Sequence, residues 1–215
     1  GRLAVMRDNL ARHEWAKKEA EEIVARAGKW LAYDDGRLLV LVPPPTVPRS
    51  HRVAYNDCPV HGQELLKLPS GYNSWLMDFD RPYKIKCPIG GEEYPGNDFY
   101  AYLQSGLKDR ALLTGDHVDD GWGWQKSPDD KFKYWFVSYY AGQMVRNYLY
   151  PALDDLSQAY LITGDGKYAH KCALLLWQLA QYYPDYQYEK QSQYGLEVDH
   201  GYNGRLLYHT WETWT

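Results

Sequence analysis

Two helices joined by a tight turn are predicted by residues 151–182, which read PALDDLSQAYLITGDGKYAHKCALLLWQLAQY. Apolar side chains recur at helical spacing through residues 152–162, and Pro151 suits a first helical turn because no backbone donor is needed there. The turn TGDG at 163–166 ends the first helix, and residues 167–182 resume the periodicity. We therefore expect a helical hairpin.

Further helices flank this hairpin on both sides. The spacing of apolar residues predicts helices over 8–27, 97–107 and 134–148, and another that begins at Arg205. Repeated helical hairpins ordinarily build either an α-solenoid or a closed (α/α) toroid. Residues 152–168 look somewhat like a tetratricopeptide hairpin, but no second copy follows at a period of about 34 residues. The expected fold class is therefore mainly α, an incomplete (α/α) toroid of helical hairpins.

A small β-rich insertion is expected to interrupt the helices. Pro and Gly are dense between residues 55 and 96, and residues 75–80 and 83–86 show the partial alternation typical of strands. The expected organisation has three parts: an N-terminal helix and connector at 1–54, the β insertion at 55–96, and the helical hairpins of the partial toroid at 97–215.

Two Cys-Pro turns inside the insertion resemble a pair of zinc knuckles. The first reads DCPVHG at 57–62, and the second reads KCPIGG at 86–91. A knuckle of this kind aims two ligands at one metal ion, but Gly90 stands at the second ligand position of the second turn. Three candidate zinc ligands remain: Cys58, His61 and Cys87.

The fourth position of this candidate zinc site is open in the sequence. Asp57, Asp80 or a water molecule could complete the coordination, because three strong ligands already make a site. The alternative is a metal-free pair of turns whose shape is kept by the Cys-Pro and Gly geometry. The third cysteine, Cys172, lies in an apolar helical run and is expected to be a buried small side chain, so no disulfide framework is predicted.

Composition and charge limit the partners that this chain could bind. The 215 residues carry a formal net charge of −4 with a sequence pI of about 6.0, so no basic field is present that would hold a nucleic-acid backbone. No apolar run approaches the roughly 20 residues of a membrane span. We therefore expect neither a nucleic-acid nor a membrane partner.

Aromatic side chains with a polar group are frequent in this chain, which has 21 Tyr and 9 Trp against 4 Phe. Such rings stack on the apolar face of a sugar and hydrogen-bond at its rim, which favours carbohydrate binding, although a helical bundle can also use Tyr in place of Leu or Phe. Trp122 and Trp124 flank Gly123 in a carboxylate-rich loop and are candidate sugar contacts. Packing against the outside of the helices is the competing interpretation.

The order of these motifs resembles the N-terminal portion of the heparinase II/III-like polysaccharide lyases over most of the chain. Besides the two Cys-Pro turns, the resemblance rests on four motifs: YPGNDF at 94–99, SG at 105–106, VDDGWG at 118–123 and LITGD at 161–165. Relatives commonly have Cys-Pro-x-Cys-Gly in at least one turn, where this chain has His61 or Gly90 in place of the inner cysteine.

The resemblance implies an incomplete (α/α) toroid, followed in the full-length family by more toroid helices and a β-sandwich. It also implies β-elimination on a uronic-acid-containing polysaccharide. That reaction needs a group that neutralises the uronate carboxylate, a base that removes the C5 proton and an acid that protonates the leaving oxygen. The family uses Asn or His for the first role and Tyr and His for the others, carried mainly on later helices and in the sandwich. The catalytic residues of this chain are therefore unassigned.

The resemblance and the two ends of the sequence lead to expectations about localisation, partners and cofactors. The sequence opens on Gly1 and stops at Thr215 in mid-pattern, so we expect a piece of a longer, secreted or periplasmic protein whose remaining C-terminal part is a partner. The chemistry requires no cofactor, and the metal expected is a structural zinc ion at the Cys-Pro turns. An acidic polysaccharide or oligosaccharide is the expected ligand, and the low net charge argues mildly against densely sulfated ones.

The last predicted helix carries candidate substrate contacts. Arg205, His209 and Glu212 follow one another at spacings of four and three, which places them on one helix face. Arg205 could bind a uronate carboxylate through two hydrogen bonds, and Glu212 could hold His209 in one tautomer. Tyr202 and Asn203 lie just before this helix and are also candidate contacts. The alternative is an ordinary solvated helix, where such polar pairs are common.

The leading hypothesis is that this chain is the N-terminal toroid portion of a polysaccharide lyase. One alternative is a glycoside hydrolase on an (α/α) toroid, which would use paired carboxylates and give no unsaturated product. Another is a non-catalytic carbohydrate-binding fragment, which would bind oligosaccharides without turnover.

Overall fold

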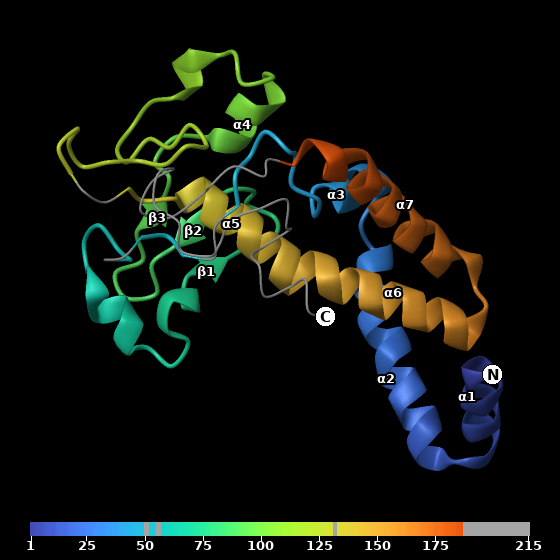
Figure 1. Ribbon diagram of the computed structural model, residues 1–215. Coiled ribbons are helices and arrows are strands. Elements are labelled where there is room, and N and C mark those ends of the chain that lie inside the picture. The colour runs from blue at the N-terminus through green and yellow to red at the C-terminus, as the bar shows by residue number, and fades with distance from the viewer. Residues whose placement is uncertain (50–51, 55–56, 131–132, 187–215) are drawn as a thin grey trace. The chain divides into compact units, whose positions relative to one another are not determined.

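The computed structural model describes residues 1–49, 52–54, 57–130 and 133–186 (Figure 1). The described residues are mainly helical with a small three-stranded sheet, which confirms the expected class at this level. They divide into two compact units. The first, here called the helical unit, contains Gly1–Pro43 and Met144–Pro184. The second, the sheet unit, contains Pro44–Gln143 together with Asp185 and Tyr186.

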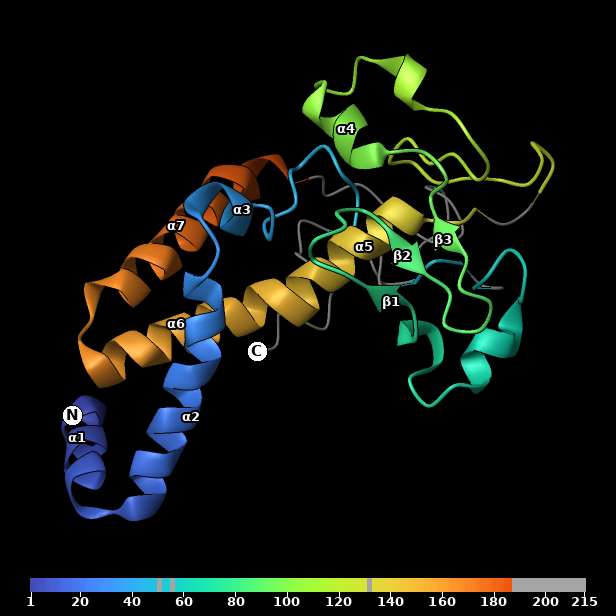
Figure 2. The ribbon, with the colours of Figure 1, turned by 180° about the vertical axis from the view of Figure 1, so that it is seen from behind.

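In the helical unit, α2 (Glu14–Leu31) packs against α6 (Tyr150–Thr163), and α6 packs against α7 (Gly166–Tyr182). Both ribbon views show α6 and α7 side by side (Figures 1 and 2). α1 (Arg2–Arg12) contacts α2, and α3 (Asp35–Leu39) contacts α7. None of the helices in the described ranges is long and apolar enough to cross a membrane.

The predicted hairpin is present as α6 and α7. α6 ends at Gly164, whose backbone is left-handed (φ +71°), a conformation that glycine adopts without steric penalty. Asp165 then caps α7, because its side chain accepts a hydrogen bond of 3.0 Å from the backbone N–H of Lys167. Cys172 of α7 is buried, as the sequence predicts. The caps and the glycine thus explain why the two helices stop and start where they do.

Asp155 joins α6 to α2 inside the helical unit. Its carboxylate is buried and accepts hydrogen bonds from Arg26 Nε at 3.0 Å and from Trp30 Nε1 at 3.1 Å. Lys29 Nζ lies 3.9 Å from the same carboxylate. Hydrogen bonds to a charged group are stronger than neutral ones, so a polar contact as well as apolar packing holds α2 against α6.

Two helices differ from the prediction in their bounds. The helix expected over 8–27 is two helices, because His13 adopts an extended backbone (φ −122°, ψ 126°) between α1 and α2. The helix expected over 134–148 is α5 (Phe136–Met144), which continues through a π-helical turn (Val145–Leu149) into α6. This turn directly precedes the start of α6, where Pro151 removes one helical hydrogen bond. The chain therefore stays helical from Phe136 to Thr163, and the expected break before Pro151 is absent.

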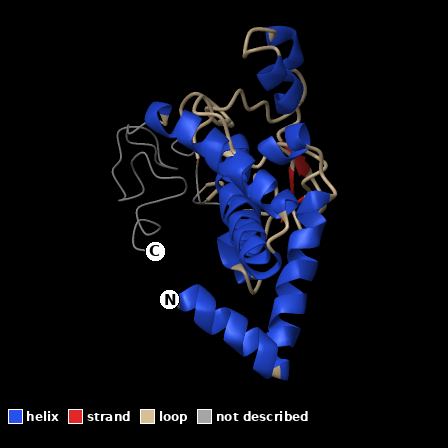
Figure 3. Cartoon of the chain, turned by 90° about the vertical axis from the view of Figure 1, so that its right-hand side faces the viewer, coloured by secondary structure: helices blue, strands red, loops and turns tan. Residues whose placement is uncertain are grey.

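The sheet unit contains three short antiparallel strands in chain order. They are labelled in Figure 1 and drawn in red in Figure 3. β1 (Leu76–Met77) pairs with β2 (Ile85–Lys86), and β2 pairs with β3 (Glu93–Tyr94). Ile85 and Tyr94 face each other in this register and are both buried, so one face of the sheet belongs to the core of the unit.

Short helical segments complete the sheet unit. α4 (Phe99–Gln104) begins after Asp98, whose side chain accepts a hydrogen bond from the backbone N–H of Ala101, as expected of an N-cap. Single 3₁₀ turns lie at Gln63–Lys67, Gly71–Asn73 and Arg110–Leu112 of this unit. A further 3₁₀ turn, Tyr183–Asp185, spans the boundary between the two units.

Aromatic rings fill much of the core of the sheet unit. Tyr94 stacks on Phe136 of α5, with ring centroids 4.7 Å apart and an interplanar angle of 11°. Trp75 and His117 meet the same Tyr94 ring edge-on, at centroid distances of 5.8 and 5.0 Å. Trp124 packs on His117 at 4.4 Å. At least part of the aromatic composition therefore serves packing.

Candidate metal centre

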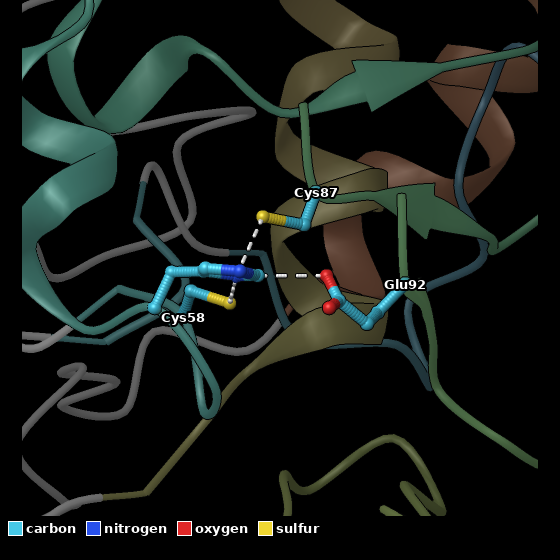
Figure 4. A group of neighbouring side chains, drawn as sticks. Cys58, Cys87 and Glu92 are labelled. Atoms are coloured by element: carbon cyan, nitrogen blue, oxygen red, sulfur yellow. Dashed lines mark hydrogen bonds and ion pairs between the residues drawn. The ribbon is translucent and has the colours of Figure 1, made fainter. Parts of the chain in front are cut away.

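Four potential metal ligands, Cys58, His61, Cys87 and Glu92, lie together in the sheet unit (Figure 4). Their ligand atoms all lie within 4.8 Å of one another. His61 Nδ1 is 3.6 Å from each cysteine Sγ and 3.6 Å from Glu92 Oε2. The structure therefore brings the three predicted ligands together and adds a fourth, close enough to hold one metal ion.

The two Cys-Pro turns position their cysteines in the same way. In each turn, the glycine four residues after the cysteine donates its backbone N–H to the cysteine carbonyl, from Gly62 to Cys58 at 2.8 Å and from Gly91 to Cys87 at 2.9 Å. Both glycines have positive φ, +55° and +83°, which side chains other than glycine rarely adopt. The shared geometry explains why the sequence repeats the Cys-Pro and Gly spacing.

Glu92 reaches the group through the β2–β3 hairpin. Cys87 and Glu92 face each other at the closed end of this hairpin, where the backbone N–H of Cys87 donates to the Glu92 carbonyl at 2.8 Å. Residues paired across a hairpin lie on the same face, so their side chains converge. The sequence prediction of Asp57, Asp80 or water as the fourth partner missed Glu92, because it relied on spacing within the turns. The register of the hairpin is the signal that would have found it.

Gly90 leaves the space in which Glu92 and His61 meet. A Cβ atom at position 90 would lie 2.2 Å from Glu92 Oε1 and 2.4 Å from His61 Cε1. Both distances are far below van der Waals contact, so no side chain fits there with Glu92 in place. The residue that makes the second turn look defective in the sequence is thus the one that admits the fourth member of the group.

Asp57 has a different partner from the one expected. Its carboxylate is fully buried and lies beside Arg52, with Oδ1 at 3.3 Å from Arg52 Nε. Burial raises the pKa of Asp57 to about 6, against the opposing effect of the Arg52 charge. Asp57 therefore supports the start of the first turn through Arg52, outside the four-residue group.

Burial makes the negative charges of the group costly unless a cation balances them. Cys58 and Cys87 are 1% and 0% exposed. Burial raises the pKa of the Cys58 thiol, while the backbone N–H groups of His61 and Val60 oppose this by donating to the sulfur. Glu92 Oε2 is buried and has no hydrogen-bond partner in the described part of the chain. A bound cation would satisfy this oxygen and both sulfur atoms at once.

The three distances from His61 Nδ1 match the edges of a tetrahedral metal site. For Zn–S bonds of about 2.3 Å and Zn–N or Zn–O bonds of about 2.0–2.1 Å, a tetrahedron has S···N edges of about 3.6 Å and an N···O edge of about 3.4 Å. The measured S···N distances are 3.6 Å, and the measured N···O distance is also 3.6 Å. The donor set of two thiols, one imidazole and one carboxylate is of the kind that suits zinc.

Asp119 organises the loop that carries the two candidate tryptophans. Its buried carboxylate accepts backbone hydrogen bonds from Gly121 at 2.8 Å, Gly123 at 2.9 Å and Val137 at 3.1 Å. Burial raises the pKa of Asp119 to about 6, and these three N–H groups oppose the rise. Asp119 is therefore a structural anchor that fixes the loop against the start of α5.

Both candidate tryptophans are half-buried in this loop. Trp124 exchanges backbone hydrogen bonds with Tyr134, at 2.8 and 2.7 Å, and its ring packs on His117 and Tyr134. The ring of Trp124 therefore contacts the aromatic cluster on one side, and Trp122 and Trp124 both stay predicted sugar contacts. The other candidate contacts lie outside the described residues: Tyr202, Asn203, Arg205, His209 and Glu212.

Comparisons of this chain with protein families, with curated proteins and with solved structures found no match.

Proposed function

We propose that Cys58, His61, Cys87 and Glu92 bind one Zn²⁺ ion with a structural role, as a modified pair of zinc knuckles. The observation that carries the proposal is the arrangement of two sulfurs and one carboxylate oxygen around His61 Nδ1 at equal distances of 3.6 Å. A ring nitrogen makes a single directional hydrogen bond, whereas a shared cation satisfies all four groups. Four protein ligands leave no open position on zinc, which is typical of structural sites.

The ion would join the first Cys-Pro turn to the β2–β3 hairpin. Bringing two thiolates and a carboxylate together costs free energy unless a cation balances their charges. Metal binding would therefore contribute to the folding of this part of the sheet unit. The zinc would take no part in chemistry on a substrate.

Titration of the reduced chain with Co²⁺ tests the proposal, because tetrahedral Co²⁺ bound to thiolates absorbs visible light. We expect one ion per chain, displaced by Zn²⁺. Cys58→Ser and Cys87→Ser should each lose the tetrahedral spectrum. Cys172→Ser is the matched control and should keep it, because Cys172 lies in the helical unit with its Sγ 3.9 Å from the Leu153 carbonyl. Binding that survives both of the first two substitutions would refute the proposal.

For the protein as a whole, we propose the N-terminal part of an (α/α) toroid in a polysaccharide lyase that acts by β-elimination on a uronic-acid-containing polysaccharide. Support comes from the α6–α7 hairpin packed on α2, together with the ordered motifs around the Cys-Pro turns. The helical unit also exposes large apolar side chains that further helices of a toroid would cover. These are Trp15, Leu161, Leu176 and Trp177, which are 49–64% exposed.

Substrate contacts in this proposal come from Trp122 and Trp124 and from the chain after the described part. Arg205 and His209 are proposed to meet the uronate carboxylate, with Tyr202, Asn203 and Glu212 beside them. The enzyme would be secreted or periplasmic, where its polymeric substrate is found.

Incubation of the full protein with heparan sulfate, chondroitin sulfate, hyaluronan and alginate tests the lyase proposal. A lyase releases an unsaturated uronate product that absorbs in the ultraviolet. New reducing ends without that absorbance would indicate a glycoside hydrolase instead, and binding of oligosaccharides without either product would indicate a carbohydrate-binding protein. The lyase proposal fails if none of the four polymers gives the absorbance.

A further inference from the structure

The two thiols of the metal group lie close enough to each other to react. Cys58 Sγ and Cys87 Sγ are within 4.8 Å, and both lie 3.6 Å from the same ring nitrogen of His61. The sulfurs of a disulfide are about 2.05 Å apart. The two sulfurs must therefore approach by at most about 2.8 Å, and rotation of one cysteine between staggered rotamers moves its sulfur by a similar distance, up to about 3 Å.

We propose that Cys58 and Cys87 form a reversible disulfide when a peroxide oxidises the metal group, and that formation of this bond releases the Zn²⁺. The inference rests on the zinc proposal above and adds a modification site to it. The co-substrate is hydrogen peroxide or an organic hydroperoxide, and the product is a metal-free, cross-linked turn pair.

The reaction balances without a redox change at zinc, which has no accessible second oxidation state. One cysteine thiolate attacks a peroxide oxygen, the O–O bond breaks, and a sulfenic acid forms together with hydroxide from hydrogen peroxide, or with an alkoxide, later protonated to the alcohol, from an organic hydroperoxide. The other thiolate attacks the sulfenic sulfur, the S–S bond forms, and a second hydroxide leaves. Two protons from the solvent convert both hydroxides to water, or the alkoxide and the hydroxide to an alcohol and water. The two sulfurs have together lost the two electrons that reduce the peroxide.

The surroundings of the two cysteines favour this outcome over deeper oxidation. The cysteines are almost fully buried, and the group meets solvent through His61 and Glu92, whose side chains are 24% and 34% exposed. A peroxide therefore meets the group first at its His61 and Glu92 side. The second thiol lies beside the first, so it intercepts a sulfenic acid before another peroxide reaches it.

The third cysteine is placed differently. Cys172 lies in the helical unit, buried in α7, and its sulfur contacts the Leu153 carbonyl. With three cysteines in the chain, the proximity of Cys58 and Cys87 therefore specifies one disulfide out of three conceivable pairs.

Stepwise addition of hydrogen peroxide to the zinc-loaded full chain tests the inference. Released zinc is followed with a coloured chelator, free thiols are counted, and the product is digested and weighed. We expect one zinc released and two thiols lost for each peroxide consumed, with a Cys58–Cys87 cross-linked peptide lighter by two hydrogen atoms. Dithiothreitol followed by Zn²⁺ should restore the starting state, and Cys172→Ser should give the same stoichiometry.

Two different failures are distinguishable in this experiment. If the reduced chain binds no zinc before peroxide is added, the zinc proposal fails and takes the redox inference with it. If zinc binds but peroxide yields sulfinic acid, or a disulfide to Cys172, the zinc proposal stands and the redox inference alone is overturned. Glu92→Gln separates the steps further, because it should weaken zinc binding and leave formation of the Cys58–Cys87 disulfide intact.

Discussion

Replacing Glu92 by Gln removes the charge of the fourth member of the metal group while keeping the shape of its side chain. If Glu92 ligates zinc, the substitution should act on the metal-loaded protein and hardly at all on the metal-free one. If Glu92 serves only as an ion-pair partner for His61, both states should suffer alike. The two states together therefore test the role of this residue.

The expected loss of zinc affinity follows from the position of Glu92 Oε2. Mutation of groups that merely support a metal ligand costs about 10–100-fold in affinity. Glu92 would be a ligand itself, so we expect a loss of at least about 100-fold, or about 2.7 kcal/mol. In the metal-free protein, Oε2 is buried without a hydrogen-bond partner among the described residues, and its contact with the partly exposed His61 is 3.6 Å long. Losing that contact should change the unfolding free energy by no more than about 1 kcal/mol.

Zinc affinity is measured by competition with a chelator of known affinity, and stability by urea unfolding with and without excess chelator. Glu93→Gln is the matched control, because Glu93 is the next residue, is similarly exposed at 37% against 34%, and pairs with Arg81 outside the group. It should leave zinc affinity unchanged. The reasoning is refuted if Glu92→Gln binds zinc as tightly as the wild type, or if it destabilises the metal-free protein by as much as the loaded one.

Three further predictions address the support of the site, the helical unit and the pH dependence. Gly90→Ala should weaken zinc binding strongly, because the new Cβ would lie 2.2 Å from Glu92 Oε1. Gly28→Ala is the control and should leave zinc affinity unchanged, because nothing lies within 4 Å of its Cβ position. Equal zinc affinities of the two variants in the competition assay would contradict this. Asp155→Ala should lower the free energy of unfolding, measured in urea, by about 2–3 kcal/mol, because Arg26 and Trp30 lose a buried hydrogen-bond acceptor. Asp154 is exposed, so Asp154→Ala should lower it by less than about 0.5 kcal/mol. Similar losses for the two variants would be evidence against the anchoring role of Asp155. Burial raises the pKa of Asp119 to about 6, above the value of about 3.9 expected in the unfolded chain, so between these values the folded state keeps a proton that the unfolded state has lost. Stability in chelator should therefore fall as the pH rises from about 4 to about 6, and Asp119→Asn should reduce that fall; an unchanged slope in urea unfolding would show that Asp119 does not cause it.

Much of the helical structure could be predicted from the sequence, because local residues decide where its helices end. Gly164 and Asp165 stop α6 and start α7, and Asp98 starts α4, each through a hydrogen bond or backbone conformation specific to that residue type. The continuity of α5 and α6 could not be predicted in this way. A proline usually signals a helix start, and the π turn that accommodates Pro151 leaves no mark of its own in the pattern of apolar residues.

Three of the four residues of the metal group could be predicted from the sequence, because they too follow from local spacing. Cys58, His61 and Cys87 follow a turn motif whose spacing is readable along the chain. Glu92 joins them through strand pairing, and Gly90 matters only because of the space it leaves, so both depend on three-dimensional contacts that spacing does not encode. The hydrogen bonds of Asp119 to the loop that carries Trp124 likewise depend on three-dimensional contacts that spacing does not encode.

X-ray absorption at the zinc edge of the loaded chain tests the central claim most directly. We expect one zinc per chain with two sulfur neighbours at about 2.3 Å and two nitrogen or oxygen neighbours at about 2.0–2.1 Å, and the loss of one of the lighter neighbours or its replacement by water in Glu92→Gln. A shell of oxygen and nitrogen atoms without sulfur, or a chain that binds no zinc when fully reduced, would contradict the claim that Cys58, His61, Cys87 and Glu92 form a metal centre.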